Sequence, residues 1–391
     1  MVNIVFYENI WYSLQLLRYT ANAAKMTASE NYRLKNKASE GLLEALRKLP
    51  MSTREPAVLP IPRGDREIGA KIEFGAGGRE YLLLVETKRF VYPLDARQAF
   101  LQLKHRMEST GRPDKGKQII PLVAAESISP GGKEFLKSKN FGFFDTGGSL
   151  FIPARDIYVY IEKPSPKIFQ KSVRNLFTGR RSQVLHALLI RHNEWFSVKD
   201  LAQFAEVSLA TASQTLSALE RFEWLDVKGR GPSKERKLAN PGALLDEWQR
   251  QTPTASRRQT HRRFYVPSSD PGDIARRLND ICEKLGLEYA LTEQSAAQIY
   301  APFLTHVSRL TCRLELDIHM NELYAGLGAR AVNEGTNLEV IETHLSGEFL
   351  FRERVDTVWL ASPVQVYLDL LCSDGRSKEM AEHLRHERIG F

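Results

Sequence analysis

The chain of 391 residues has only three cysteines, and they lie too far apart to form a recognisable motif. Cys282, Cys312 and Cys372 include no C-x-x-C pair and no cysteine–histidine cluster with the spacing of zinc ligands. The sequence therefore predicts neither a disulfide framework nor a structural metal site. Because reduced, buried thiols are typical of cytoplasmic proteins, we expect a cytoplasmic location.

Long hydrophobic runs are missing as well. No apolar stretch approaches the roughly 18 residues of a transmembrane helix. The apolar start, MVNIVFYENIWYSLQLL, lacks the basic segment that opens a signal peptide. We therefore expect no association with a membrane. With 42% hydrophobic and 26% charged residues, the composition is that of a globular protein large enough for two or three domains.

Acidic residues are outnumbered, since 47 Asp and Glu face 55 Lys and Arg, which gives a net charge of +8. Residues 163–240 alone carry 14 basic and 7 acidic side chains, a local excess of +7. A concentrated excess of positive charge favours a nucleic-acid partner. Polar, proline-containing segments at 163–167 and 251–263 indicate linkers. We divide the chain into three predicted domains: 1–162, 163–250 and 260–391.

The first domain is predicted to run from a helix through a β-hairpin to a second helix and a buried strand. Residues 67–74 alternate between polar and apolar side chains, GAGG at 75–78 is a turn, and YLLLVETK returns as a more deeply buried strand. Glu86 and Lys88 are two residues apart on that strand. Their side chains therefore point to the same face of the sheet.

This order of elements, with Glu-x-Lys on the second hairpin strand, resembles the core of PD-(D/E)XK nucleases. The resemblance implies an α/β/α domain in which Asp65 and Glu86 bind Mg²⁺ and Lys88 stabilises charge at the attacked phosphate. It also implies a polar residue, Gln98, near the site. The sequence RGDRE around Asp65 lacks the Pro-Asp of the motif. Glu67 is the substitute for Asp65 as the first metal-binding carboxylate. We favour a nuclease-like fold that does not cut, with a metal-dependent DNA endonuclease as the alternative.

Residues 182–240 predict three helices followed by a hairpin, as in a winged helix-turn-helix. Ser197 is a good N-cap for the second helix, with Asp200 placed to complete a capping box, and Ser208 is placed to cap the third. The third helix has an apolar stripe at 212, 216 and 219, so its small polar side chains project elsewhere. Short hydroxyl and amide groups suit a helix that lies in a major groove.

The glycine-rich, basic loop GRGPSKERK then forms the predicted wing, whose cations would contact phosphates. A winged helix used only for protein contacts is the alternative. The predicted DNA-binding residues are Ser208, Thr211, Ser213, Gln214, Ser217 and Arg221 in the third helix, and Lys228, Arg230, Lys234, Arg236 and Lys237 in the wing.

The last region carries a second resemblance, on LTEQSAAQIYAPF at 291–303, on ASPVQVYLDLL and GRSKEMAEHLR within 361–385, and on ALLDEW at 243–248. Together with the winged helix, residues 182–391 resemble the AbiEi-type family, antitoxins of type IV toxin–antitoxin systems and related bacterial regulators. The resemblance implies a regulator that binds double-stranded DNA and counters a toxin. A plasmid or mobile-element factor as partner, and a homodimer, stay open.

The same region contains RLELDIHM, which places Glu315 and Asp317 on one face of a strand. Nucleotidyltransferases hold Mg²⁺ with such a carboxylate pair, but they also need an upstream Gly-Ser turn, and residues 292–295 are TEQS. We predict an α+β, nucleotidyltransferase-like domain without catalysis. The sequence thus predicts a multidomain α/β regulator that is not an enzyme and needs no cofactor, unless its nuclease-like site is active and binds Mg²⁺.

Overall fold

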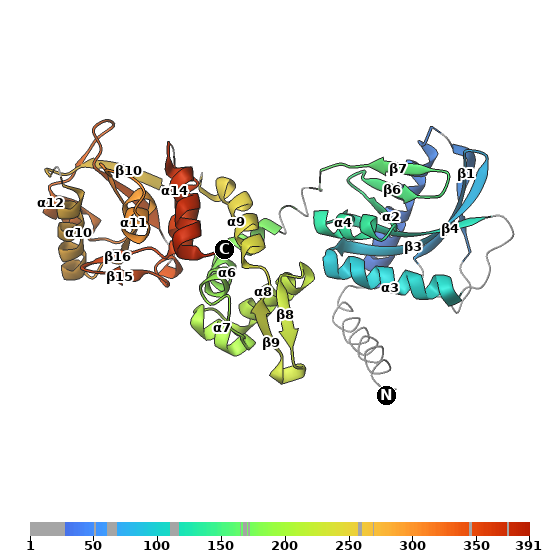
Figure 1. The fold of residues 1–391 in the computed structure, drawn as a ribbon, viewed down its shortest axis with the longest axis horizontal. Helices are drawn as coiled ribbons and strands as arrows, with labels where there is room; N and C mark the ends of the chain where they lie inside the picture. The colour runs from blue at the N-terminus through green and yellow to red at the C-terminus, as the bar shows by residue number, and fades with distance from the viewer. Residues whose placement is uncertain are drawn as a thin grey trace. The chain divides into compact units, whose positions relative to one another are not determined.

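The computed structural model forms two compact units, Met1–Gln170 and Lys171–Phe391, hereafter unit 1 and unit 2 (Figure 1). The predicted boundary after residue 162 falls close to the boundary between them. The residues that the structure describes are 28–50, 52–60, 69–109, 117–164, 166, 170, 173–256, 260–268, 270–343, 346–373 and 375–391.

Unit 1 is a seven-stranded sheet with helices on both faces. Strands β1 to β3 are antiparallel neighbours, β3, β4 and β5 are parallel, and β6 and β7 return antiparallel at the edge. The elements are α2 (Ala28–Arg47), β1 (Ser52–Leu59), β2 (Ala70–Ala76), β3 (Arg79–Val91), α3 (Pro93–Ser109), β4 (Gln118–Ile128), α4 (Pro130–Ser138), β5 (Gly142–Asp145), β6 (Leu150–Pro153) and β7 (Tyr158–Ile161).

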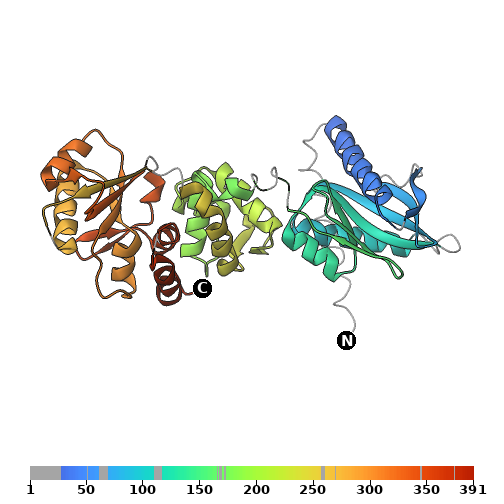
Figure 2. The same cartoon turned by 90° about the horizontal axis from the view of Figure 1, so that it is seen from above.

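Two hydrophobic cores hold these layers together. Helix α2 buries Leu42 and Leu46 against one face of the sheet, with Ile72 and Leu83. Helices α3 and α4 cover the other face, where Leu103 of α3 packs in the same core as strand residues of β3 and β4. Figure 2 shows α2 on one side of the sheet and α3 and α4 on the other. The predicted order of helix, hairpin, helix and strand is confirmed, whereas β1 was not predicted.

Unit 2 begins with a helix–hairpin part, defined as α6 to α9. Its order of three helices and a hairpin agrees with the prediction, and Phe196 adds a short bridge to Arg236 of the hairpin. The elements are η1 (Asn175–Phe177), α6 (Arg180–Ile190), α7 (Val198–Phe204), α8 (Leu209–Arg221), β8 (Leu225–Lys228), η2 (Gly231–Ser233), β9 (Glu235–Leu238) and α9 (Pro241–Ser256).

The predicted helix caps are confirmed. The Ser197 hydroxyl accepts a hydrogen bond from the Asp200 backbone N–H at 3.2 Å, and the Asp200 carboxylate accepts one from the Ser197 N–H at 3.2 Å. These reciprocal bonds satisfy backbone donors that the first turn of α7 leaves without partners. The Ser197 hydroxyl also donates to the Asp200 carboxylate at 2.7 Å, and this bond is the chief cause that lowers the pKa of the Asp200 carboxyl.

The C-terminal part of unit 2, residues 260–391, is built on a second seven-stranded sheet in the order β13-β10-β14-β12-β11-β16-β15. Helix α10 packs against α12, and α11 packs against α13 and α14. The elements are β10 (Thr260–Tyr265), α10 (Pro271–Leu285), β11 (Tyr289–Leu291), α11 (Glu293–Tyr300), β12 (Leu310–Glu315), α12 (Met320–Leu327), β13 (Arg330–Ala331), β14 (Leu338–Thr343), η3 (Ser346–Glu348), β15 (Glu353–Val355), β16 (Val358–Leu360), α13 (Pro363–Leu370), α14 (Ser377–Leu384) and η4 (Arg385–Ile389).

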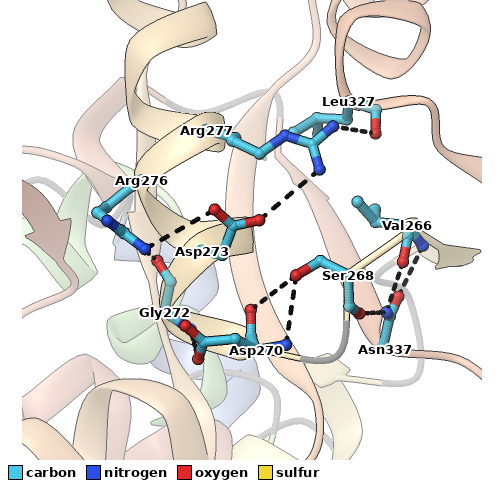
Figure 3. A network of polar contacts seen from close by, with 9 residues as sticks. All are labelled: Val266, Ser268, Asp270, Gly272, Asp273, Arg276, Arg277, Leu327 and Asn337. Carbon is cyan, nitrogen blue, oxygen red and sulfur yellow. Dashed lines mark hydrogen bonds and ion pairs between the residues drawn. The ribbon is translucent and has the colours of Figure 1, made fainter.

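A polar network fixes the turn between β10 and α10 (Figure 3). The Asn337 side chain donates hydrogen bonds to the Val266 and Ser268 carbonyls and accepts one from the Val266 N–H, at 2.7 to 2.9 Å. Asp270 caps α10 by accepting from the Gly272 N–H at 2.9 Å, and Arg277 donates to the Leu327 carbonyl at 2.7 Å. The network therefore satisfies backbone groups and joins α10 to the end of α12, a structural role.

The helix–hairpin part and the C-terminal part pack as one compact unit, although we predicted a linker between them at 251–263. His186 of α6 is buried and lies 2.5 Å from the Ser362 hydroxyl, which caps α13. Burial lowers the pKa of His186 to about 3, so this contact involves the neutral imidazole. Arg385 pairs with Asp246 of α9 at 2.7 Å.

Among the described residues, no helix has the length and apolar character to cross a membrane.

Candidate nucleic-acid interface

Helix α8 has one buried and one exposed face. Ala212, Leu216 and Leu219 are fully buried, as their spacing predicted. Gln214 and Ser217 are exposed on the opposite side of the helix. These two side chains are polar, and Ser213 and Arg221 beside them are partly exposed, whereas Leu209 and Ala210 in the first turn are exposed and apolar. The helix thus offers a solvent-facing polar stripe that is supported from below by a packed core.

The N-terminus of α8 uses two of the predicted DNA-binding residues for its own cap. The Ser208 hydroxyl accepts from the Thr211 N–H at 3.1 Å and lies 2.9 Å from the Thr211 hydroxyl. Because these hydroxyls bind each other, they first stabilise the start of the helix. The residues further along the helix are therefore better placed to meet a ligand.

Arg181 is a neighbour of this stripe that sequence reasoning missed. It comes from the first turn of α6, and its guanidinium donates a hydrogen bond to the Gln214 side-chain oxygen at 3.3 Å. The contact joins α6 to the Gln214 amide near the centre of α8. The signal was present in the sequence as the adjacent arginines 180 and 181 at the start of an apolar helix, within the basic segment 163–240.

A cavity of about 520 Å³ is lined by the first residues of α7, by α8 and by the hairpin. Lys199 and Lys234 contribute cations to it, and Ser213 contributes a hydroxyl from the polar stripe. The first residues of α8 also line it, so the positive end of the helix dipole adds to the lysine charges. Such a cavity favours an anion. Its lining consists of Ser197, Val198, Lys199, Leu209, Ala210, Ser213, Gly231, Lys234 and Arg236.

The hairpin is tied to α8 by an ion pair that changes the role expected for Arg236. Its side chain is only 8% exposed, and its Nε donates to the Glu220 carboxylate at 2.6 Å. Lys234 reaches the other oxygen of the same carboxylate at 2.9 Å. Arg236 is therefore not exposed for a phosphate contact, contrary to the sequence prediction, because Glu220 neutralises it inside the domain. Lys234 is more exposed and also lines the cavity.

The remaining hairpin cations differ in their surroundings. Lys228 pairs with Glu235 at 2.8 Å and lies 4.5 Å from the centre of the Trp195 ring, a contact that the sequence did not indicate. Arg230 is exposed at the hairpin tip. Lys237 is half-buried opposite Asp226 in the strand register. Arg230 at the exposed tip and Lys234, which lines the cavity although it shares Glu220 with Arg236, are the wing cations that we select as candidates to meet an external anion.

The nuclease-like pair is the second candidate site, in unit 1. Glu86 and Lys88 do lie together, with 3.4 Å between carboxylate and ammonium. Arg106 of α3 reaches the other Glu86 oxygen at 3.1 Å, and the Glu86 side chain is only 11% exposed. Two cations therefore already contact this carboxylate, and a divalent metal would compete with them for its oxygens.

Two further predictions for that site have different outcomes. Asp65 and its substitute Glu67 lie outside the described residues. Gln98 is half-buried on α3, eight residues before Arg106, which is about 12 Å along a helix axis. Within the described ranges, no group of three His, Cys, Asp or Glu side chains could hold a metal ion. The structure thus brings Glu86 and Lys88 together and adds Arg106.

The two carboxylates predicted for the C-terminal part do not lie on one strand, because only Glu315 belongs to β12. The Thr292 N–H donates to the Thr311 carbonyl at 2.9 Å, whereas the Glu315 N–H donates to Glu288 at 3.0 Å. Glu315 is therefore about 13 Å along β12 from the turn at 292–295. Asp317 lies beyond the strand and accepts from the His319 N–H at 2.9 Å. The prediction that Glu315 and Asp317 share one face of a strand is therefore wrong, because β12 ends at Glu315.

These observations define a mixed α/β protein with a helix–hairpin part whose exposed face is polar and basic. Residues 237–389 match the family described as transcriptional regulator, AbiEi antitoxin, type IV TA system. The predicted resemblance to that family is confirmed for this segment. The match begins within β9 and includes α9 and the C-terminal part, so α6, α7 and α8 lie outside it. No curated protein and no solved structure matches the chain.

Proposed function

We propose that this protein is an antitoxin-type transcriptional regulator that binds duplex DNA through α8 and the β8–β9 hairpin, acting as a winged helix. The observation that carries the proposal is the exposed polar stripe of α8 beside a cavity that contains Lys199 and Lys234. The family match of residues 237–389 supports the regulator class. The net charge of +7 over residues 163–240 favours the same partner.

In this proposal α8 lies in the major groove, and the side chains of the interface have two different roles. Ser213, Gln214 and Ser217 approach base edges, where an amide can form a bidentate pair with adenine. Lys199, Lys234 and Arg230 contact phosphates, which position the helix without reading sequence. Arg236 acts indirectly, because its ion pair with Glu220 holds the hairpin against α8.

A cognate toxin is the proposed second partner, since the matching family consists of type IV antitoxins. A factor from a plasmid or mobile element is the alternative partner. If the DNA site is a palindrome, two copies of the chain would read its half-sites, so we propose a homodimer on DNA. Its half-sites would lie about one helical turn, 10 to 10.5 base pairs, apart.

The proposal is tested first at Gln214, the polar residue that Arg181 contacts. Gln214→Ala is expected to reduce discrimination between the DNA upstream of the protein's own gene and a scrambled duplex by about 1–3 kcal/mol, roughly 5- to 150-fold. Fluorescence anisotropy with both duplexes measures this. Gln251→Ala, which removes an amide on α9 bonded to Glu247, is the matched control. Equal loss on both duplexes would show that Gln214 does not read bases.

For unit 1 we propose a nuclease-like fold that does not cut, and for the C-terminal part a nucleotidyltransferase-like fold without catalysis. The observation that supports the first is the position of Arg106, whose guanidinium already binds Glu86. We therefore expect the protein to act without a metal cofactor. An Mg²⁺-dependent endonuclease that uses Asp65, Glu86 and Lys88 is the second candidate.

The two candidates predict opposite results in a cleavage assay. The purified chain should leave supercoiled and linear duplex intact with Mg²⁺ or Mn²⁺. Arg106→Ala should also leave the DNA intact, because we propose that the fold as a whole has lost the cleavage reaction. Metal-dependent nicking by the native chain that disappears in Lys88→Ala would establish the endonuclease instead. Arg89→Ala, which removes an adjacent cation on the same strand, controls for general loss of charge.

A further inference from the structure

The outermost strand of unit 1 presents two aromatic side chains to solvent. Strand β7 is last in the sheet order, and its Tyr158 and Tyr160 are 65% and 39% exposed. Because they are two residues apart on a strand, they share one face of the sheet, about 7 Å apart. That is the face covered elsewhere by α3 and α4, since Phe151 of its core contacts both rings. Neighbouring exposed aromatic side chains mark a binding surface more often than isolated ones.

The two rings are held in fixed positions. Both make edge-type contacts with Phe151, with ring centroids 5.6 Å from Tyr158 and 5.9 Å from Tyr160. The Tyr160 phenol donates a hydrogen bond to the Glu162 carboxylate at 2.5 Å, which raises the pKa of the phenol. A pre-oriented ring loses little conformational freedom when a ligand stacks on it. The pair is therefore suited to a planar ligand, which on Tyr160 displaces the Lys137 ammonium that lies 4.0 Å from the ring centre.

A lysine ammonium of α4 contacts the same surface. The Lys137 ammonium lies 4.0 Å from the centre of the Tyr160 ring, and Lys139 follows at the exposed end of α4. The Glu162 carboxylate accepts from the Tyr160 phenol and adds a negative charge at this edge. On a larger scale, residues 1–162 contain 24 basic and 18 acidic side chains, whereas residues 241–391 contain 17 and 22. Unit 1 thus attracts anions independently of the helix–hairpin part.

We propose that Tyr158, Tyr160 and Lys137 form a stacking platform for single-stranded nucleic acid. Aromatic side chains on an open sheet stack the unpaired bases of a single strand, and nearby cations bind its phosphates. A duplex does not offer the same contact, because its bases are already stacked on one another. The platform is separate from the proposed duplex-binding surface, and it adds a second kind of nucleic-acid ligand.

The test uses the full chain and fluorescein-labelled 12-nucleotide oligo(dT) and oligo(U), which distinguish DNA from RNA. Replacing both tyrosines with alanine is expected to weaken binding at least tenfold, because stacking on each ring is lost. Replacing both with phenylalanine should keep the affinity within about twofold, since the ring faces remain. Tyr265→Ala removes a 45% exposed tyrosine on a strand of unit 2 and should change nothing. Anisotropy titrations measure all four proteins.

Several results would overturn the platform. The first is no binding of either oligonucleotide by the native chain. Equal losses for the alanine and phenylalanine pairs, with circular dichroism showing both folded, would also exclude stacking. So would a change in sedimentation without a change in affinity, because the tyrosines would then serve self-association. If Arg230→Ala with Lys234→Ala removes single-strand binding instead, the ligand binds the hairpin. Duplex affinity should be unchanged in the tyrosine variants, which separates this test from that of the proposed function.

Discussion

Replacing both Arg230 and Lys234 with alanine is expected to weaken duplex binding about tenfold for each lost contact, on the order of 1.5 kcal/mol per charge-assisted hydrogen bond. The slope of log K against log salt should become shallower by about 2, because two phosphate contacts no longer release counterions. The loss should be similar on specific and scrambled duplexes, since phosphates carry no sequence information. Anisotropy titrations between 50 and 200 mM salt measure both quantities.

Two controls make this result interpretable. Lys284→Ala removes an exposed cation on α10, outside the proposed interface, and should leave affinity and slope unchanged. Arg236→Ala should act differently, because it leaves Glu220 with Lys234 alone and loosens the hairpin from α8. Its main effect should be reduced stability of unit 2. Equal changes in the Lys284 variant, or an unaltered salt slope in the double variant, would contradict the proposed phosphate contacts.

The largest effect on stability is expected for Arg313→Ala. The Arg313 guanidinium is buried and binds both oxygens of Asp369, at 2.8 and 2.5 Å, and it also contacts Glu348. Burial opposes its charge, but the two carboxylates outweigh burial and raise the pKa of Arg313, so it stays charged. Its removal leaves Asp369 buried without a cation. The free energy of unfolding of unit 2 should fall by about 3–5 kcal/mol.

Urea unfolding followed by tryptophan fluorescence measures this loss, because four of the five tryptophans lie within residues 171–391. Arg354→Ala is the matched control. It breaks an ion pair with Glu283 at 2.9 Å whose partners are both about half exposed, and it should cost less than about 1 kcal/mol. If the two variants lose the same stability, the buried pair does not hold the C-terminal part together in the way described.

Local features of the helix–hairpin part could be predicted from the sequence. Ser197 with Asp200, and Ser208, are recognisable caps because each acts within three residues of its own position. The buried stripe of α8 follows directly from helical spacing, and the structure confirms it. These predictions succeeded because backbone geometry alone brings the residues together.

Contacts between distant residues could not be predicted in the same way. Arg236 looked like a free wing cation because its partner, Glu220, lies sixteen positions away on another element. Arg106 is twenty positions from Glu86, and no local pattern connects them. Glu315 shows the same difficulty for strands, since periodicity gives the face of a residue but not its register against a neighbouring strand.

Hydrogen–deuterium exchange of the full chain, with and without duplex DNA, tests the central claim most directly. Backbone amides report where the duplex lies without any substitution that could disturb the fold. Slower exchange is predicted for peptides from α8 and from residues 228–237, with no change in α10 or α12. Protection restricted to other elements, at a duplex concentration that saturates binding, would contradict the proposal that α8 and the hairpin bind DNA.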